Sequence, residues 1–252
     1  MKKVILIAIN LMREIFRKKD MYVLITMLLI LMIYLANAAF FGMKHIYRYL
    51  NEIGLGLVFF FSIIIAVPNA ARLMIEEIRG KTIYPLLAKP IRRIHVIAGK
   101  FMGSLFVSWS SFALFFLVFT VISVFKQSQG EWLLYSQVFI AGIFMLAVLN
   151  AMTICFSVFC TFSTTVTLSY TILFLMSWFG ANMRESFYRL PLLGEIAYYI
   201  LPHFEFFDLR HRLIYNWSPL PLWVMLSICA YAALYTTALL FFALQGFKKR
   251  WL

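Results

Sequence analysis

One uncharged stretch constrains this chain more than any other feature of its sequence. Residues 138–182 contain no Asp, Glu, Lys or Arg over 45 consecutive positions. A helix needs roughly 20 residues to cross the hydrocarbon core of a bilayer, so the stretch is long enough for two crossings. The hydroxyl-rich run Thr161–Thr165 is the best place for a turn between them, because such side chains suit tight connections. We therefore expect membrane helices at 138–160 and 166–182.

Four further apolar runs have the length of a membrane helix: 21–41, 53–75, 101–125 and 220–247. Of all residues 63% are hydrophobic and 13% are charged, which excludes an ordinary soluble domain and an intrinsically disordered chain. The apolar runs are continuous rather than alternating, which favours helices over a membrane barrel. We expect an all-α membrane protein with six transmembrane helices, forming a single transmembrane domain over residues 1–252.

The distribution of the 23 Lys and Arg residues predicts the orientation of these helices. With the N terminus in the cytosol, 16 of the cations fall on the cytosolic side and 7 on the opposite side. Since cytosolic loops carry the excess of Lys and Arg, both termini are expected in the cytosol, with the chain integral to the cytoplasmic (inner) membrane. A basic face against anionic lipid head groups also explains the net charge of +13 without any nucleic acid.

Residues 2–19 are predicted to form an amphipathic helix before the first crossing. Val4, Leu11 and Ile15 follow the spacing of one helical face, whereas Arg13 falls away from it. A short basic helix of this kind is expected to lie in the membrane interface. The alternative is a solvated positive flank that only sets the topology.

The connection 76–100 is the longest on the cytosolic side, and it presents a short apolar element, 83–88, among basic residues. Such an element suits a docking surface for a soluble partner, and the alternative is a connection packed on the protein's own cytosolic face. Gly80-Lys81-Thr82 is no phosphate-binding loop, because Ile75 stands where that motif needs a Gly. We therefore expect that any ATP is bound by another polypeptide.

This connection resembles the segment between spans two and three of the type-2 family of ATP-binding-cassette (ABC) transporter permeases. That family places an acidic residue, a Gly or basic residue with Thr, a Leu-Leu pair, a Pro, an Arg and a Gly-Lys there, in this order. The corresponding residues of this chain, with the apolar Ile83 added, are Glu76, Glu77, Gly80, Thr82, Ile83, Leu86, Leu87, Pro90, Arg93, Gly99 and Lys100. Lys81 departs from the pattern, because many relatives have adjacent Gly and Thr.

Two further stretches, Arg79–Leu87 and Leu201–Asp208, are similar to one branch of that family, often labelled multi-copper enzyme maturation permeases. The copper label belongs to a few relatives and is not carried over to this chain. The resemblance implies a permease that works as a pair, with a second copy or a paralogue, and with two ABC ATPase subunits. ATP and Mg would be bound by those subunits, and the connection 76–100 would be the coupling element seated in an ATPase groove.

Other candidate sites are weaker. His203, Glu205, Asp208 and His211 lie in the extracytoplasmic segment 183–219, but spacing alone does not make a metal site, and ion pairs are the favoured role. The three Cys residues lie in predicted spans, where packing is favoured over chemistry. We expect no catalytic residue, metal site or cofactor in this chain.

Within the spans, the polar groups of Asn37, Asn150 and the run 163–171 are interpreted as contacts that hold helices together. The aromatic runs 59–61 and 174–179 either wall a lipid-like route between two protomers or face lipid. No Asp, Glu, Lys or Arg lies in the middle of a span, which argues against an ion-coupled pump and favours an uncharged or amphiphilic cargo.

Three functions remain open. The first is the permease of an ATP-driven exporter of a hydrophobic or amphiphilic substrate, whose path the sequence does not show. The second keeps the ATPases but transmits force to an extracytoplasmic partner without moving cargo. The third is a membrane scaffold or channel with no ATPase. In each of them the chain itself is not an enzyme.

Overall fold

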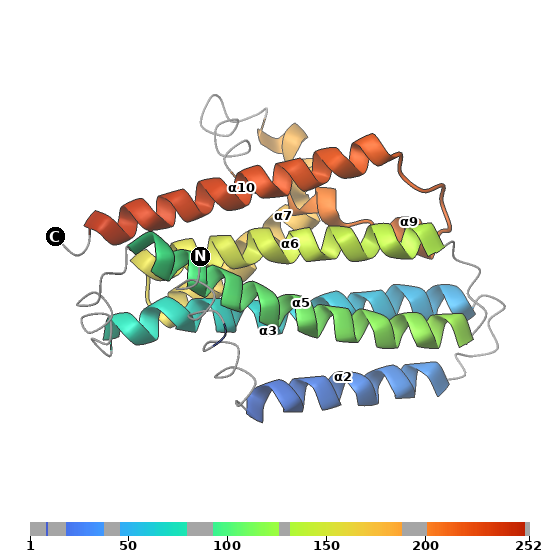
Figure 1. The fold of residues 1–252 in the computed structure, drawn as a ribbon. Helices are drawn as coiled ribbons and strands as arrows, with labels where there is room; N and C mark the ends of the chain where they lie inside the picture. The colour runs from blue at the N-terminus through green and yellow to red at the C-terminus, as the bar shows by residue number, and fades with distance from the viewer. Residues whose placement is uncertain are drawn as a thin grey trace.

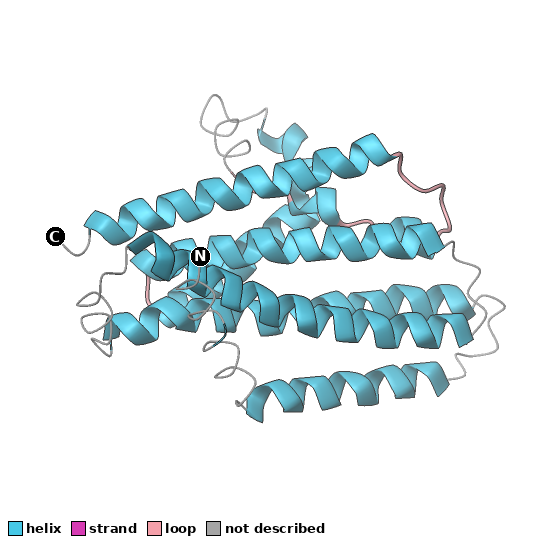
Figure 2. Ribbon diagram, viewed as in Figure 1, coloured by secondary structure: helices cyan, strands magenta, loops and turns pink. Residues whose placement is uncertain are grey.

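The chain folds into long helices packed side by side (Figures 1 and 2). A computed structural model describes residues 9, 19–37, 46–79, 93–125, 132–187 and 201–249, and contains no strand within these ranges. The long helices are α2 (Lys19–Asn37), α3 (Ile46–Arg79), α5 (Arg93–Phe125), α6 (Trp132–Phe159), α7 (Phe162–Phe187) and α10 (Leu222–Lys249). Two short helices, η1 (Phe204–Phe207) and α9 (Arg210–Ile214), lie in what we call the η1–α9 segment, residues 201–219.

The all-helical membrane class predicted from the sequence is confirmed for the described residues. Four helices are long and apolar enough to cross a membrane, within Asn51–Leu73, Ile94–Phe125, Trp132–Phe159 and Leu222–Lys248. The apolar parts of α2 and α7, Tyr22–Tyr34 and Phe162–Ser177, are shorter, so the count of six crossings remains a prediction. Apart from Ile9 and Lys19, the predicted interfacial helix 2–19 lies outside the described residues.

Two connections differ from the sequence-based expectation. Helix α3 continues to Arg79 and α5 begins at Arg93, so both flanks of the predicted loop 76–100 are helical. The predicted turn at Thr161–Thr165 is also shorter, since α7 begins at Phe162 and the Thr161 carbonyl accepts a bond from Thr165 N–H. The hydroxyls of Thr161 and Thr164 lie 2.9 Å apart, so these side chains hydrogen-bond within the first helical turn.

Helix α6 lies at the centre of the bundle, and contacts α3, α5, α7 and α10 (Figure 1). The connections alternate between two ends of the molecule. At the α3–α5 end, α3 ends, α5 begins and α10 ends, and α9 lies at the opposite end. This alternation fits a chain whose successive helices run in opposite directions across one membrane.

Close helix contacts depend on small residues and buried aromatic rings. A Cβ added at Gly142 of α6 would overlap the ring of Phe112 on α5, and one at Gly54 of α3 would lie 2.8 Å from Phe119. The Phe112 ring is fully buried and stacks on Phe139, with ring centroids 5.6 Å apart. Because hydrophobic burial gives little driving force between helices in lipid, such close packing carries much of the bundle's stability.

Buried polar side chains join neighbouring helices, as the sequence suggested for Asn150. Its Nδ2 donates to Ser108 Oγ at 3.1 Å, which links α6 to α5. Thr153 of α6 donates to Ser169 of α7 at 3.2 Å. Such bonds satisfy polar groups that would otherwise be costly in an apolar interior.

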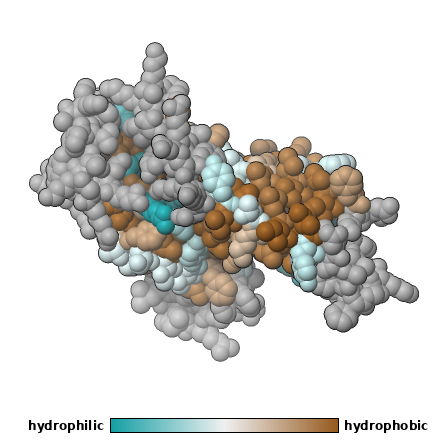
Figure 3. All heavy atoms as spheres, turned by 90° about the horizontal axis from the view of Figure 1, so that it is seen from below, coloured by the Kyte–Doolittle hydropathy of each residue, from teal (hydrophilic) through white to brown (hydrophobic). Residues whose placement is uncertain are grey.

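The surface of the bundle is broadly apolar. Figure 3, a view from the side on which α2 lies, shows hydrophobic side chains over much of the described surface. Exposed apolar residues on α2 and α10 include Tyr22, Ile30, Ile33, Tyr34, Leu222, Trp223, Leu226, Leu234, Phe241 and Phe242. A soluble monomer rarely exposes so many large apolar side chains, and lipid is the solvent that fits them.

Helix α3 contains Pro68 in its interior. Proline has no N–H, so the bond that residue 68 would donate to the Ile64 carbonyl is missing. The helix nevertheless continues to Arg79, and Ala70 and Ala71 beyond the proline are fully buried.

Candidate functional site

The predicted coupling residues divide between the two helices that meet at the α3–α5 end. Glu76 and Glu77 lie in the last turn of α3, Arg93 begins α5, and Gly99 and Lys100 follow in its second turn. The remaining six, Gly80, Thr82, Ile83, Leu86, Leu87 and Pro90, lie outside the described residues. The structure therefore brings both flanks of the predicted element to one end of the bundle.

Lys100 connects these two flanks. Its side chain is only 1% exposed, and Nζ donates a hydrogen bond to the main-chain carbonyl oxygen of Leu73 on α3. A buried ammonium group is costly unless it is hydrogen-bonded, and the carbonyl oxygen of Leu73 supplies that bond. Lys100 thus fastens the start of α5 to the end of α3.

Two more contacts fasten the α3–α5 end. The guanidinium of Arg72 lies 5.5 Å from the ring centroid of Phe162, the first residue of α7, at cation–π distance. On α10, Gly246 packs so closely on Phe159 of α6 that a Cβ would overlap the ring. The end of α3 is therefore joined to α5 by a hydrogen bond and to α7 by a charge–ring contact.

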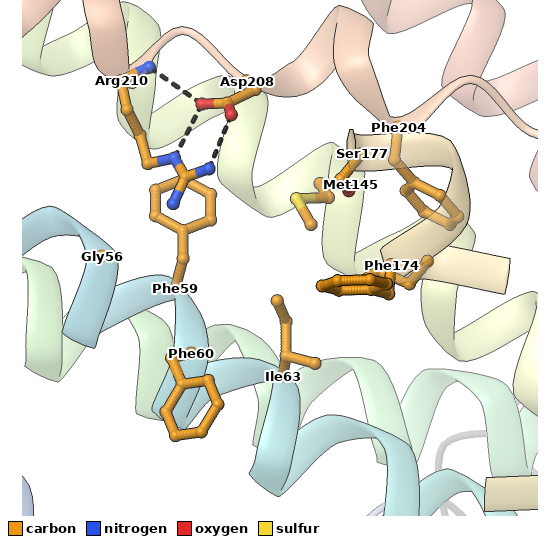
Figure 4. A pocket seen from close by; sticks show the side chains of 11 residues that line it. Gly56, Phe59, Phe60, Ile63, Met145, Phe174, Ser177, Phe204, Asp208 and Arg210 are labelled. Carbon is orange, nitrogen blue, oxygen red and sulfur yellow. Dashed lines mark hydrogen bonds and ion pairs between the residues drawn. The ribbon is translucent and has the colours of Figure 1, made fainter. Parts of the chain in front are cut away.

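A pocket of about 230 Å³ lies between α3, α6, α7 and the η1–α9 segment (Figure 4). Its walls are mostly apolar, and three polar side chains line it, two of them in the η1–α9 segment. The lining residues are Gly56, Phe59, Phe60, Ile63, Met145, Leu173, Phe174, Ser177, Phe204, Asp208 and Arg210.

The polar end of the pocket is an ion pair. Arg210 donates from Nε to Asp208 Oδ1 at 2.7 Å and from Nη2 to Oδ2 at 2.6 Å, a bidentate arrangement (Figure 4). Burial acts to raise the pKa of Asp208, but the hydrogen bonds and the charge of Arg210 outweigh it and hold this pKa below its ordinary value. The hydrogen bond to Asp208 likewise raises the pKa of Arg210. Both groups are therefore charged at neutral pH.

Arg210 also contacts the wall of the pocket. Its guanidinium carbon lies 5.3 Å from the ring centroid of Phe59 on α3 (Figure 4). The Phe59 ring is buried and packs edge-on against Phe112 of α5, with centroids 5.4 Å apart. The η1–α9 segment is thereby seated on α3 through a cation–π contact.

Hydrogen bonds to α10 hold the other side of the η1–α9 segment. The N–H of His203 donates to Tyr231 Oη at 2.9 Å, and Tyr235 Oη donates to the Leu201 carbonyl at 3.1 Å. Within the segment, the side chains of Phe204 and Phe207 of η1 are buried against the bundle. The segment is thus a packed part of the bundle that bridges α3 and α10.

The residues considered for a metal site do not converge in the structure. Over the described ranges, no group of three His, Cys, Asp or Glu side chains lies close enough to hold an ion. Asp208 is engaged by Arg210, which confirms the expected ion pair. Glu205 Oε1 lies 3.7 Å from His203 Nδ1, and burial raises the pKa of Glu205.

The pocket itself was not predicted, although the sequence drew attention to part of its wall. Phe59, Phe60 and Phe174 belong to the aromatic runs considered for a lipid-like route. Gly56 and Met145 carried no local signal, because their placement depends on how separate helices pack. Asp208 and Arg210, two residues apart in the sequence, were the available hint of an ion pair.

Comparison with known proteins covers about three quarters of the chain. The family described as ABC-2 family transporter protein matches residues 5–196 of the chain. This match includes the helices α2 to α7 and the predicted coupling element, and stops before the η1–α9 segment. A comparison with curated proteins gives no match.

Proposed function

Because the chain belongs to the ABC-2 family of transporter proteins, we propose that it is the membrane-spanning permease subunit of an ATP-driven ABC transporter. The family match over residues 5–196 is the observation that carries this proposal. ATP hydrolysis is assigned to separate ATPase subunits that bind Mg and ATP. The permease works as a pair, with a second copy or a paralogue, and with two ATPase subunits.

Coupling is assigned to the segment between α3 and α5. The contacts at the α3–α5 end support this assignment, because the Lys100–Leu73 hydrogen bond and the Arg72–Phe162 contact join three helices there. A force applied between Arg79 and Arg93 would reach α3, α5 and α7 together. Pro85 and Pro90 stiffen the segment by fixing φ, and Leu86 and Leu87 supply its apolar seat.

The proposed orientation follows the charge distribution. The α3–α5 end and both termini are assigned to the cytosol, and the η1–α9 segment to the outer side of the cytoplasmic membrane. The expected cargo is hydrophobic or amphiphilic, since the pocket has apolar walls and one polar end. The packed η1–α9 segment also supports a second candidate, force transmission to an extracytoplasmic partner without cargo.

Substitutions in the coupling element test the proposal. Leu86→Asp or Leu87→Asp places a charge in the apolar seat, and is expected to abolish stimulation of the partner ATPase while leaving the bundle folded. Trp217→Asp, at an exposed position of the η1–α9 segment, is the matched control for added charge. Copurification of the ATPase with the tagged permease and ATP hydrolysis in proteoliposomes are the measurements. Unchanged ATPase binding and activity in both Leu variants would contradict the coupling assignment.

The same preparation separates the three functions. Vanadate-sensitive movement of an amphiphile across proteoliposomes supports the exporter. Vanadate-sensitive ATP hydrolysis without movement of any amphiphile supports force transmission. If no ATPase copurifies in stoichiometric amount, both are excluded and a scaffold or channel remains.

A further inference from the structure

The pocket is reached from the side of the bundle. Phe60 of α3 is 57% exposed and Phe174 of α7 is 53% exposed, and both line the pocket. Deeper walls are formed by Phe59, Met145 and Phe204, which are buried. Because α3 is a candidate membrane span and α7 an apolar helix, the lateral mouth opens where lipid surrounds the protein.

The dimensions suit one narrow chain. Gly56 and Ile63 line the pocket along α3 and are seven residues apart, which is about 10 Å of helix. This depth fits within one leaflet, about 15 Å of hydrocarbon. The volume of about 230 Å³ is below the roughly 300–1,000 Å³ of sites for drug-sized molecules. The part of an acyl chain nearest the head group fits such a slot, and a bulky ring system does not.

The polar end suits a group that carries both charges. The bonds to Asp208 use two of the five N–H donors of the Arg210 guanidinium, which leaves donors for an anionic oxygen. A carboxylate has about four lone-pair sites, and Asp208 accepts three bonds from Arg210, one of them from its main-chain N–H, so one site is left for an ammonium group. The ion pair has no net charge. A purely anionic head group is therefore repelled by Asp208, and a purely cationic head group is repelled by Arg210.

From these observations we propose that the pocket holds a zwitterionic membrane phospholipid by the part of one acyl chain nearest its head group. The phosphate lies against Arg210, the ammonium group lies against Asp208, and the second chain stays in the surrounding lipid. The claim that this phospholipid is the transported substrate rests on the proposed function. The claim that the pocket binds the phospholipid does not, and it can be tested without any ATPase.

The test uses a phosphatidylethanolamine with a photoactivatable diazirine in one acyl chain. The full chain is placed in nanodiscs of anionic phosphatidylglycerol that contain a small fraction of this probe, and labelled peptides are mapped by mass spectrometry. Labels are expected on peptides containing Phe59–Ile63 and Leu173–Ser177, saturating as the probe fraction rises. Unlabelled phosphatidylethanolamine should remove them. Peptides containing the exposed Leu226 and Leu234 of α10 should label in proportion to the probe and resist competition.

Gly56 and Ala230 supply a matched pair of variants. A Cβ at Gly56 meets nothing within 4 Å, so α3 has room for a larger side chain there, and Ala230→Leu, at an exposed position of α10 outside the pocket, is the control that should retain labelling within about twofold. Gly56→Leu extends a side chain into the slot and should reduce pocket labelling about tenfold, with the α10 labels unchanged. Arg210→Gln should remove the preference for phosphatidylethanolamine over a diazirine fatty acid.

Three results would overturn the inference: pocket labels that do not saturate, pocket labels unchanged in Gly56→Leu, or equal labelling by the fatty acid in the unaltered protein. The competition experiment needs no variant, so it decides the matter even if Gly56→Leu fails to fold. Because labelling requires no ATP, its failure leaves the Leu86→Asp coupling result standing. Conversely, loss of the coupling assignment leaves the lipid site standing.

Discussion

The ammonium group of Lys100 is bonded to the main-chain carbonyl oxygen of Leu73, across a connection that separates them by 27 residues. This buried contact joins the two helices that flank the proposed coupling element. A motion of α5 relative to α3 would have to break the hydrogen bond between Lys100 and Leu73. The bond therefore makes the end of α3 and the start of α5 a single mechanical unit.

Replacing Lys100 should separate its packing role from its bonding role. In Lys100→Met the side chain still fills the buried space, and loss of the bond is offset by removal of a buried charge, so the change in unfolding free energy should be within about 1 kcal/mol. Lys100→Ala removes the buried stem as well and should cost about 2–5 kcal/mol. Thermal midpoints in detergent check this order. Equal midpoints for the two variants would show that the stem carries no packing energy.

Lys100→Met should also weaken coupling, because α3 and α5 are then free to move separately. The expected result is reduced ATPase stimulation with normal copurification of the ATPase. Normal stimulation of the ATPase by this variant would show that the bond between Lys100 and Leu73 does not take part in coupling.

Gly142→Ala should destabilise the bundle. The added Cβ overlaps the Phe112 ring, which is fully buried and stacked on Phe139, so the ring has no open space to enter. We expect a loss of about 1–3 kcal/mol, measured as a lower thermal midpoint. Gly56→Ala is the control, because its Cβ meets nothing and alanine favours a helix by up to about 1 kcal/mol. A midpoint that falls equally in both variants would rule out the Phe112 contact as the cause.

Acid should loosen the η1–α9 segment only at low pH. Arg210 holds the pKa of Asp208 below its unfolded value of about 3.9, so the ion pair contributes full stability above that value. The contribution is lost as the pH falls through the lowered pKa of the folded state. The difference in thermal midpoint between the unaltered protein and Asp208→Asn should be constant from pH 5 to 7 and shrink below about pH 4. A difference that already shrinks near pH 6 would mean that another group controls the segment.

A double-mutant cycle should detect the bond between Asn150 and Ser108. Intramembrane hydrogen bonds have coupling energies of about 0.6 kcal/mol on average and up to about 1.7. We expect a value in this range for Asn150→Ala and Ser108→Ala, measured from midpoints of the single and double variants. Thr237→Ala is the control, because among the described residues the exposed Thr237 hydroxyl bonds to carbonyls of its own helix. Additive effects at positions 108 and 150 would mean that the contact contributes no stability.

Sequence reasoning located the helices better than their ends. An apolar run overlaps each long helix that the structure describes, because hydropathy picks out the apolar stretches from which such helices are built. It does not report where helical hydrogen bonding stops, so the predicted crossing 101–125 excluded the first eight residues of α5. Lys100 shows the reason, since a charged residue at the edge of an apolar run can lie buried if a carbonyl oxygen accepts its hydrogen bond.

The pocket could not be predicted in the same way. The run 59–61 is equally aromatic throughout, yet Phe59 and Phe61 are buried whereas Phe60 is exposed. Which ring points inward depends on the rotation of α3 against α5 and α6, and no local pattern encodes that rotation. The approach of Arg210 to Phe59 likewise joins residues about 150 positions apart in the sequence.

Pro68 introduces a point of easier bending into α3, although the helix is continuous from Ile46 to Arg79. Gly56 to Ile63, on one side of Pro68, form the aromatic wall against which a ligand would rest, and Leu73 lies on the other side. Because Pro68 has no N–H to donate to the Ile64 carbonyl, α3 can bend at this point without breaking a hydrogen bond between these two residues. In the proposed transporter, a force applied beyond Leu73 would bend α3 at Pro68 and move this wall, so that a bound molecule would be squeezed or released without unwinding of the helix.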